Sequence, residues 1–290
     1  MVKITRLDVP QCSVGEGPVW DVQTQRLYWI DILAKAVFCL DPATGATQRW
    51  SVPNIIGSMA IRKDGGAIVA LANGVHTLDF ATGECRMLAS SPDLNEQVQL
   101  ADGKVDRRGR FIVGSSDRGM KEARGKLYAL DPGATQLRAI DSDIFLANGP
   151  CWSPDDRLFY HADSIRKLIY VYDYDIERGT VANRRPFAST ADLGGIPDGA
   201  TVDVEGCVWS AICEGGKLVR YRPDGSIERM VEMPLKFPAS VMFGGRDLDR
   251  LFVPTLSPAF LGRPADPLDG STFVVDGLGV RGLPEPRFGA

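Results

Sequence analysis

A short β-rich unit recurs six times along this 290-residue chain, and the repeat limits the architectures that the sequence can adopt. Each unit contains a turn rich in Gly, Asp and Pro followed by an apolar strand, as at residues 26–30, 110–113 and 157–160. The units recur at intervals of about 40 to 50 residues, which leaves room for four strands in each. We therefore predict an all-β fold, a six-bladed β-propeller with four-stranded antiparallel blades.

The two ends of the chain are predicted to meet in the last blade. The sixth unit runs from Ser240 through Phe252 to residues 273–275 and lacks a clear outermost strand. The N-terminal segment 3–7 can supply that strand and close the ring. Because no linker interrupts the period, residues 1–290 are predicted to form a single propeller domain. The segment 256–270, rich in Pro and Gly, is predicted to be a surface loop over one face.

Three side chains with oxygen donors occupy one position of the repeat. Glu16, Asn148 and Asp198 align when the units are superposed on their Gly-containing turns. In a closed ring one repeat position corresponds to one height around the axis, so these side chains should converge. Asp-Gly and Asn-Gly are common turns when taken singly, but three oxygen ligands at one position favour a site for one divalent metal ion. Oxygen ligands suit Ca²⁺, Mg²⁺ or Mn²⁺, and Zn²⁺ also accepts them.

Composition excludes several other classes of function. The net charge is −4 without a basic tract, which argues against nucleic acid or an anionic membrane as a partner. No apolar run approaches the roughly 18 residues of a membrane span, and the start lacks a signal-peptide pattern. The six cysteines lack CxxC spacing and are interpreted as reduced core residues of a cytoplasmic protein. Two histidines are too few to favour His-rich zinc sites or a Ser-His-Asp triad.

A metal ion held by three protein ligands keeps coordination positions for water and substrate. Such an ion polarises a carbonyl group and lowers the pKa of bound water. Asp198 could also act as a general base on that water. Ester or lactone hydrolysis is therefore the reaction class that these residues suggest.

Several motifs resemble the SMP-30/gluconolactonase/LRE (regucalcin-like) family. They are Gly-Glu-Gly-Pro-Val-Trp at 15–20, Asn-Gly-Pro-Cys-Trp-Ser-Pro-Asp at 148–155 and Pro-Asp-Gly-Ala-Thr-Val-Asp at 197–203. The resemblance covers essentially the whole chain and implies a propeller with one divalent cation in its axial pocket. It also implies hydrolysis of a sugar lactone to the aldonic acid. Carried over by position, Glu16, Asn148 and Asp198 would be the metal ligands, and Asp198 would also be the catalytic base.

One segment departs from the family pattern. The family usually has Arg-x-Asn-Asp-Gly-Lys before the third-blade strand, and the Arg and Asn contact the sugar. Here Gln99 replaces the cation and Ala101 the amide, while Asp102 is kept. Gln99 and Asp102 are therefore candidate substrate-binding residues. Arg118 and Lys121, in the loop that follows, could recognise an acidic or otherwise modified lactone, although such a loop can also be merely solvated.

Two other functions stay open. The same metal ligands could hydrolyse another ester, such as an aryl ester or an organophosphate. The chain could also be a non-catalytic propeller that binds a ligand, because the fold alone does not decide. The sequence leaves open the sugar, the ring size, the native metal and the oligomeric state, for which a monomer or weak homo-oligomer is expected. Four tryptophans on strand patterns are predicted to be core residues: Trp20, Trp29, Trp152 and Trp209. A structural role is predicted for His161.

Overall fold

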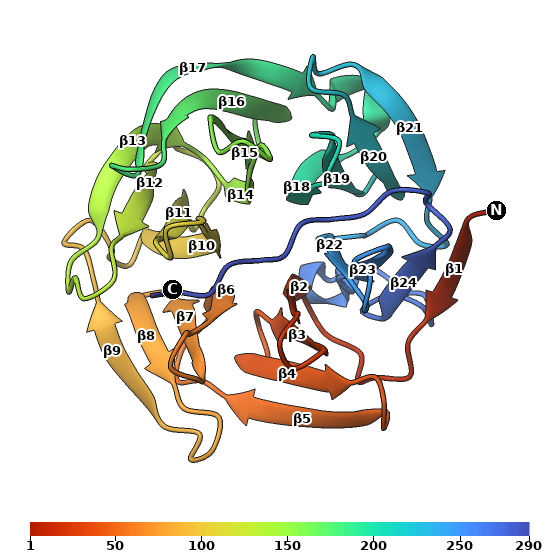
Figure 1. The fold of residues 1–290 in the computed structure, drawn as a ribbon, viewed down its shortest axis with the longest axis horizontal. Helices are drawn as coiled ribbons and strands as arrows, with labels where there is room; N and C mark the ends of the chain where they lie inside the picture. Colours follow the sequence, from red (N-terminus) through yellow and green to blue (C-terminus); the bar gives the residue numbers. More distant parts are fainter. Residues whose placement is uncertain (290) are drawn as a thin grey trace.

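Six four-stranded antiparallel sheets surround a central axis in the computed structural model, which describes residues 1–289 (Figure 1). The predicted six-bladed β-propeller is confirmed. Blade 1 contains β2 (Gly15–Asp21), β3 (Arg26–Asp31), β4 (Ala36–Asp41) and β5 (Ala46–Ser51). Blade 2 contains β6 (Ile56–Ile61), β7 (Ala67–Leu71), β8 (Gly74–Leu78) and β9 (Cys85–Ala89). Blade 3 contains β10 (Val98–Val105), β11 (Phe111–Asp117), β12 (Gly125–Leu130) and β13 (Arg138–Ile144).

The second half of the ring repeats this arrangement. Blade 4 contains β14 (Ala147–Trp152), β15 (Leu158–Asp163), β16 (Leu168–Asp175) and β17 (Thr180–Ser189). Blade 5 contains β18 (Ile196–Val202), β19 (Val208–Cys213), β20 (Lys217–Tyr221) and β21 (Ile227–Glu232). Blade 6 contains β22 (Met242–Gly244), β23 (Arg250–Pro254), β24 (Thr272–Asp276) and β1 (Lys3–Arg6). Two 3₁₀ turns, η1 (Ala191–Leu193) and η2 (Pro258–Leu261), lie in connecting loops.

The N-terminal strand closes the ring, as the sequence predicts. β1 pairs antiparallel with β24, in a register that runs from Lys3 opposite Asp276 to Arg6 opposite Phe273. This pairing covers the backbone edge that β24 would otherwise expose. It also joins the two ends of the chain in one sheet, so blade 6 cannot form without both.

The core lies between neighbouring blades, where their apolar faces meet. One cluster joins Tyr28 and Ile30 of blade 1 to Met59 and Val69 of blade 2. The tryptophans predicted to be core residues are at most 7% exposed. All six cysteines are free thiols, and five of them are buried. No helix among residues 1–289 has the length and apolar character needed to cross a membrane.

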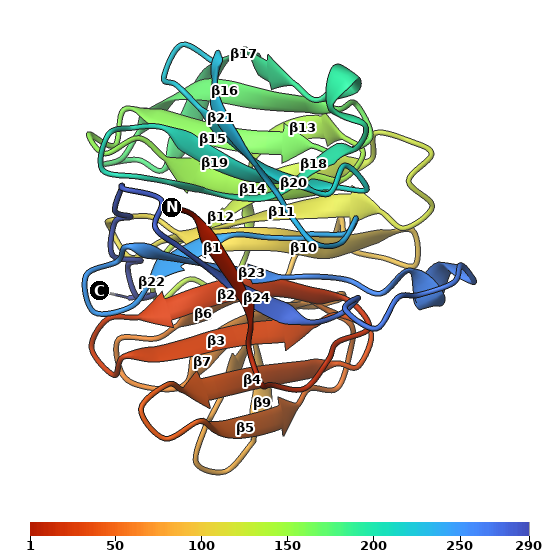
Figure 2. The same cartoon turned by 90° about the vertical axis from the view of Figure 1, so that its right-hand side faces the viewer.

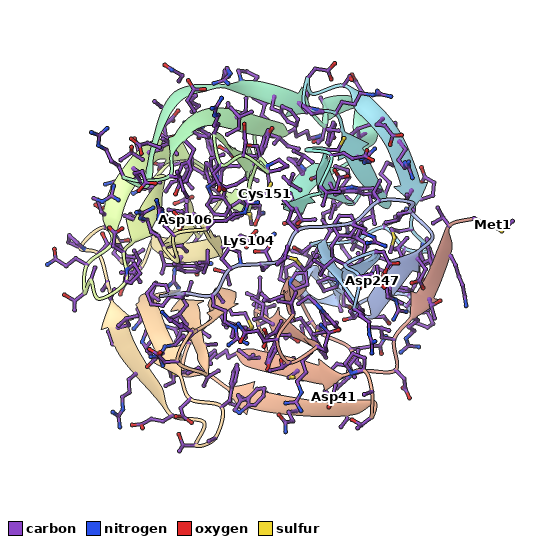
Figure 3. All side chains as sticks on the ribbon, in the orientation of Figure 1. Met1, Asp41, Lys104, Asp106, Cys151 and Asp247 are labelled. Atoms are coloured by element: carbon purple, nitrogen blue, oxygen red, sulfur yellow. The ribbon has the colours of Figure 1, made fainter. Side chains whose placement is uncertain are left out.

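The two faces of the ring differ. The C-terminal segment 277–289 crosses the axis on one face (Figure 1), and the loop 256–270 with η2 projects from the other (Figure 2). The segment is fixed by backbone hydrogen bonds, such as Lys63 N–H to the Phe288 carbonyl at 2.9 Å. Near the axis, the Lys104 ammonium group donates to the Ala200 carbonyl at 2.7 Å and lies 3.8 Å from Glu285 (Figure 3). The propeller is therefore covered at one end of its axis.

Candidate metal and substrate site

A β-bulge occurs at the same level in five of the six innermost strands. In β2 the pairing with β3 shifts between Glu16 and Val19, and in β14 the pairing with β15 shifts between Asn148 and Cys151. Equivalent shifts interrupt β6, β10 and β18. An extra residue bends the strand and turns side chains away from the regular pleat. The bulges therefore mark one repeat position, the shared register (Glu16, Gly57, Ala101, Asn148 and Asp198).

The bulges also let neighbouring strands approach closely. Gly149 has a φ of +60°, and a Cβ atom on it would lie 2.8 Å from the Asp198 carbonyl oxygen. Only glycine fits there without a shift of the backbone. The Asn-Gly pair that the sequence presents as a turn thus brings the strand of Asn148 against the strand of Asp198.

All five residues of the shared register line one axial cavity of about 170 Å³. Two further carboxylate or amide side chains, Asp102 and Gln99, line it as well, together with the hydroxyl-bearing Ser116. The rest of the wall is mainly aliphatic. We call the larger of these side chains the aliphatic collar (Val14, Ile32, Ile55, Leu100, Leu146 and Leu256).

The Glu16 carboxylate is buried with one oxygen free. Glu16 is 5% exposed, and its Oε2 accepts a hydrogen bond from the Gly17 N–H at 2.5 Å. Its Oε1 has no hydrogen-bond partner. Burial, and then the nearby charges of Asp198 and Asp102, hold the pKa of Glu16 well above its usual range. Such a group is costly to bury as a lone anion, and a cation at its free oxygen would remove that cost.

Asp198 and Asp102 bring two more carboxylates to the same cavity. Asp198 is 8% exposed, and burial followed by the charge of Asp102 holds its pKa well above its usual range. Asp102 accepts hydrogen bonds from the Gly103 N–H at 2.7 Å and the Gly149 N–H at 2.9 Å. Burial also raises the pKa of Asp102, opposed by the charge of Lys104. Because Gly149 follows Asn148, Asp102 fixes the bulge that presents this candidate ligand.

The orientation of the Asn148 amide follows from its neighbour Ser164. The Ser164 hydroxyl donates its only proton to the Pro197 carbonyl at 2.6 Å. It must therefore accept at its oxygen, and the Asn148 Nδ2 group donates to it at 2.9 Å. With the amide nitrogen used in this way, the amide oxygen of Asn148 is left for another partner. Ser164 also ties the strand of Asn148 to the residue before Asp198.

This donor set fits a hard divalent cation. It offers carboxylate oxygens from Glu16 and Asp198, and an amide oxygen from Asn148 that its own hydrogen bonding leaves free. Two members of this set are acidic and the third is an amide. Among residues 1–289 there is no cluster of three His, Cys, Asp or Glu side chains that could hold a metal ion. The assignment of these three residues as metal ligands stays a prediction.

The predicted substrate residues fall into two groups. Gln99 and Asp102 line the cavity. Arg118 instead lines a separate groove formed with Asn73, Asn95 and Glu96 among others. Lys121 is exposed, and its backbone N–H donates to Asp117 at 2.9 Å. The roles of all four residues stay predictions, but only Gln99 and Asp102 are in position to touch a molecule in the cavity.

Three features of the site were missed by reasoning from sequence. Ser164 orients the Asn148 amide, although its place after β15 gave no sign of this. Ser116 lines the cavity and accepts a hydrogen bond from the Ala147 N–H at 3.1 Å. The aliphatic collar could have been found from the repeat, because several of its members lie two residues before the shared register. His161 does not line the cavity and is 1% exposed in β15.

The fold and the site together define a six-bladed β-propeller with an acidic axial cavity. The sequence profile of the SMP-30/Gluconolactonase/LRE-like region matches residues 14–257, and the chain belongs to this family. It is 36% identical to the 6-deoxy-6-sulfogluconolactonase of Pseudomonas putida, over 97% of both chains. It is 33% identical to the regucalcin of Danio rerio, over 94% of this chain and 93% of that one.

Solved structures agree with this assignment. A luciferin-regenerating enzyme superposes with a TM-score of 0.90 at 25% sequence identity, covering 99% of both chains. A calcium-binding protein, the regucalcin of Agrobacterium tumefaciens, superposes with a TM-score of 0.90 at 26% identity, covering 98% of this chain and 97% of that one.

Proposed function

We propose that this protein is a metal-dependent lactone hydrolase that opens a sugar lactone to the aldonic acid. The observation that carries the proposal is the convergence of Glu16, Asn148 and Asp198 from three blades on one cavity, with Glu16 Oε1 lacking a partner. The names of the relatives support the reaction class, since one is a sulfogluconolactonase. A calcium-binding relative of the same fold supports a divalent cation.

Glu16, Asn148 and Asp198 would hold the cation. When bound, such an ion polarises the lactone carbonyl and lowers the pKa of water. Asp198 takes up the proton of the attacking water, since its carboxylate lines the cavity in which the lactone would lie. The water oxygen bonds to the acyl carbon, the bond from that carbon to the ring oxygen breaks, and the ring oxygen receives the proton. The product is the open-chain hydroxy acid.

The test is proton release from a panel of aldonolactones. Protein stripped of metal is assayed alone and after addition of Ca²⁺, Mg²⁺, Mn²⁺ or Zn²⁺. We expect activity to depend on added metal and to fall by at least about 100-fold in Asp198→Asn, because both a ligand and the base are impaired. The matched control is Asp224→Asn, an exposed turn residue in the same blade, which should keep full activity. Activity that survives in Asp198→Asn, or that ignores every metal, would contradict the mechanism.

A further inference from the structure

The apolar side chains that line the axial cavity follow the same sequence repeat as its carboxylates. The position two residues before the shared register lies at or just before the start of the inner strands, and its side chains line the same cavity. In four blades this position is occupied by Val14, Ile55, Gln99 and Leu146. Val14 pairs with Leu256 in an isolated bridge, so this position lies toward the face that carries the loop 256–270. A substrate entering from that face meets this ring before it meets the carboxylates.

The ring has few polar groups to offer. Three of its four members are aliphatic, and Ile32, Leu100 and Leu256 extend the apolar wall between them. Several polar groups below it are already engaged. The amide nitrogen of Asn148 donates to Ser164, and both oxygens of Asp102 accept backbone N–H groups. A substrate hydroxyl group pressed against this wall would lose its hydration without gaining a partner.

The charge of the cavity is also one-sided. Glu16, Asp102 and Asp198 contribute carboxylates, and no Lys or Arg side chain lines the cavity in the described part of the chain. A divalent cation offsets only two of these three charges. Arg118, the cation expected from sequence to read an acidic group, lines the separate groove. An anionic substituent on the lactone would therefore meet a wall with no counter-charge.

We infer that the preferred lactone is neutral and carries an apolar substituent, such as the methyl group of a 6-deoxyaldonolactone. This inference rests on the proposed lactonase function and narrows its substrate class. The aliphatic collar surrounds the cavity from five of the six blades. A substituent on the lactone therefore contacts aliphatic side chains in most orientations. Gln99 is the one polar member of the ring, and it stands where the family usually has a cation.

Three lactones that differ only at carbon 6 test the inference. D-Fucono-, D-galactono- and D-galactaro-1,4-lactone share the same ring and the same C5 hydroxyl group, and they end in a methyl, a hydroxymethyl and a carboxylate group, respectively. We expect kcat/KM to be about 10- to 100-fold higher for the methyl than for the hydroxymethyl lactone, the usual range for one such group in an apolar pocket. The carboxylate lactone should be the slowest of the three.

Variants locate the preference in the ring. Leu146→Gln and, separately, Ile55→Gln replace half-buried members and should reduce the methyl preference several-fold. Gln99→Arg should raise the rate on the carboxylate lactone relative to the other two. Ile165→Gln, at a position 39% exposed and outside the cavity, should keep the wild-type ratios.

The outcomes separate this inference from the function beneath it. If the hydroxymethyl or carboxylate lactone is the fastest, the inference is wrong while the lactonase stands. Equal rates for all three, unchanged by the ring variants, would refute it in the same way. If no lactone is opened with any metal, the proposed function fails and takes the inference with it.

Discussion

His161 should make the fold sensitive to acid. Its side chain is 1% exposed on β15, near the ring of Phe159, and neither ring nitrogen has a hydrogen-bond partner. Burial, followed by the charge of Arg184, lowers the pKa of His161 from 6.5 to about 3. The folded protein therefore keeps a neutral imidazole at pH values where the unfolded chain binds a proton.

The sign and the size of the effect follow from this difference. Because the folded pKa lies below the unfolded one, stability is lost as the pH falls below 6.5, and the loss continues until the folded state also binds a proton near pH 3. Between pH 7 and pH 5, the unfolded state gains about 2 kcal/mol from this single group. In His161→Leu this contribution disappears, and two unpartnered polar atoms leave the core.

Urea unfolding at pH 7, 6 and 5 measures the effect. We expect His161→Leu to be more stable than the wild type, by a margin that grows by about 2 kcal/mol from pH 7 to pH 5. His76→Leu is the control, because His76 is also buried but its Nδ1 lies 3.1 Å from the Gly74 carbonyl oxygen. It should show a smaller growth. A margin for His161→Leu that is constant with pH would refute the reasoning.

Three further predictions concern the site and its support. Ser164→Ala should weaken Ca²⁺ binding by about 10- to 100-fold in calorimetry, since it frees the Asn148 amide to rotate. The control is Ser153→Ala, at another buried serine, which should leave Ca²⁺ binding unchanged; equal affinities for both variants would exclude the role of Ser164 in orienting Asn148. Gly149→Ala should lower stability by more than about 1 kcal/mol, because its Cβ would meet the Asp198 carbonyl oxygen, and a wild-type urea midpoint would contradict this. Arg287→Ala should destabilise by about 1–3 kcal/mol in the same assay, because the guanidinium group donates to both carboxylate oxygens of the buried Asp21 at 2.7 Å; no change would mean that the tail contributes little.

The repeat explains why so much of the fold could be predicted from the sequence. Turn residues and short apolar strands are local signals, and their period specifies the number of blades and the shared register. The same period predicts that Glu16, Asn148 and Asp198 share one level. The closing of the ring by residues 3–6 also followed, because the sixth unit is visibly one strand short.

The remaining features depend on individual side-chain contacts, or on their absence, which the repeat pattern does not show. Ser164 acts on Asn148 of its own blade, but its proton goes to Pro197 in the next one. Arg118 is close in sequence to the cavity-lining Ser116, yet it lines another groove. The loop that carries it is turned back by the Asp117 carboxylate, which accepts the backbone N–H of Lys121. Likewise, a strand pattern cannot reveal that the imidazole of His161 lacks a partner.

The C-terminal segment across one face limits how substrate can enter the axial cavity and how product can leave it. The segment 277–289 crosses the axis (Figure 1), and its residues Leu283, Pro284 and Glu285 line a pocket there with Lys104. We therefore expect a molecule to reach the axial cavity from the opposite face, which carries the loop 256–270 (Figure 2). Substrate and product would then pass through the same opening of the cavity, one after the other. A hydroxy acid that has not departed blocks the next lactone, and it should act as a competitive inhibitor whose departure sets an upper limit on turnover.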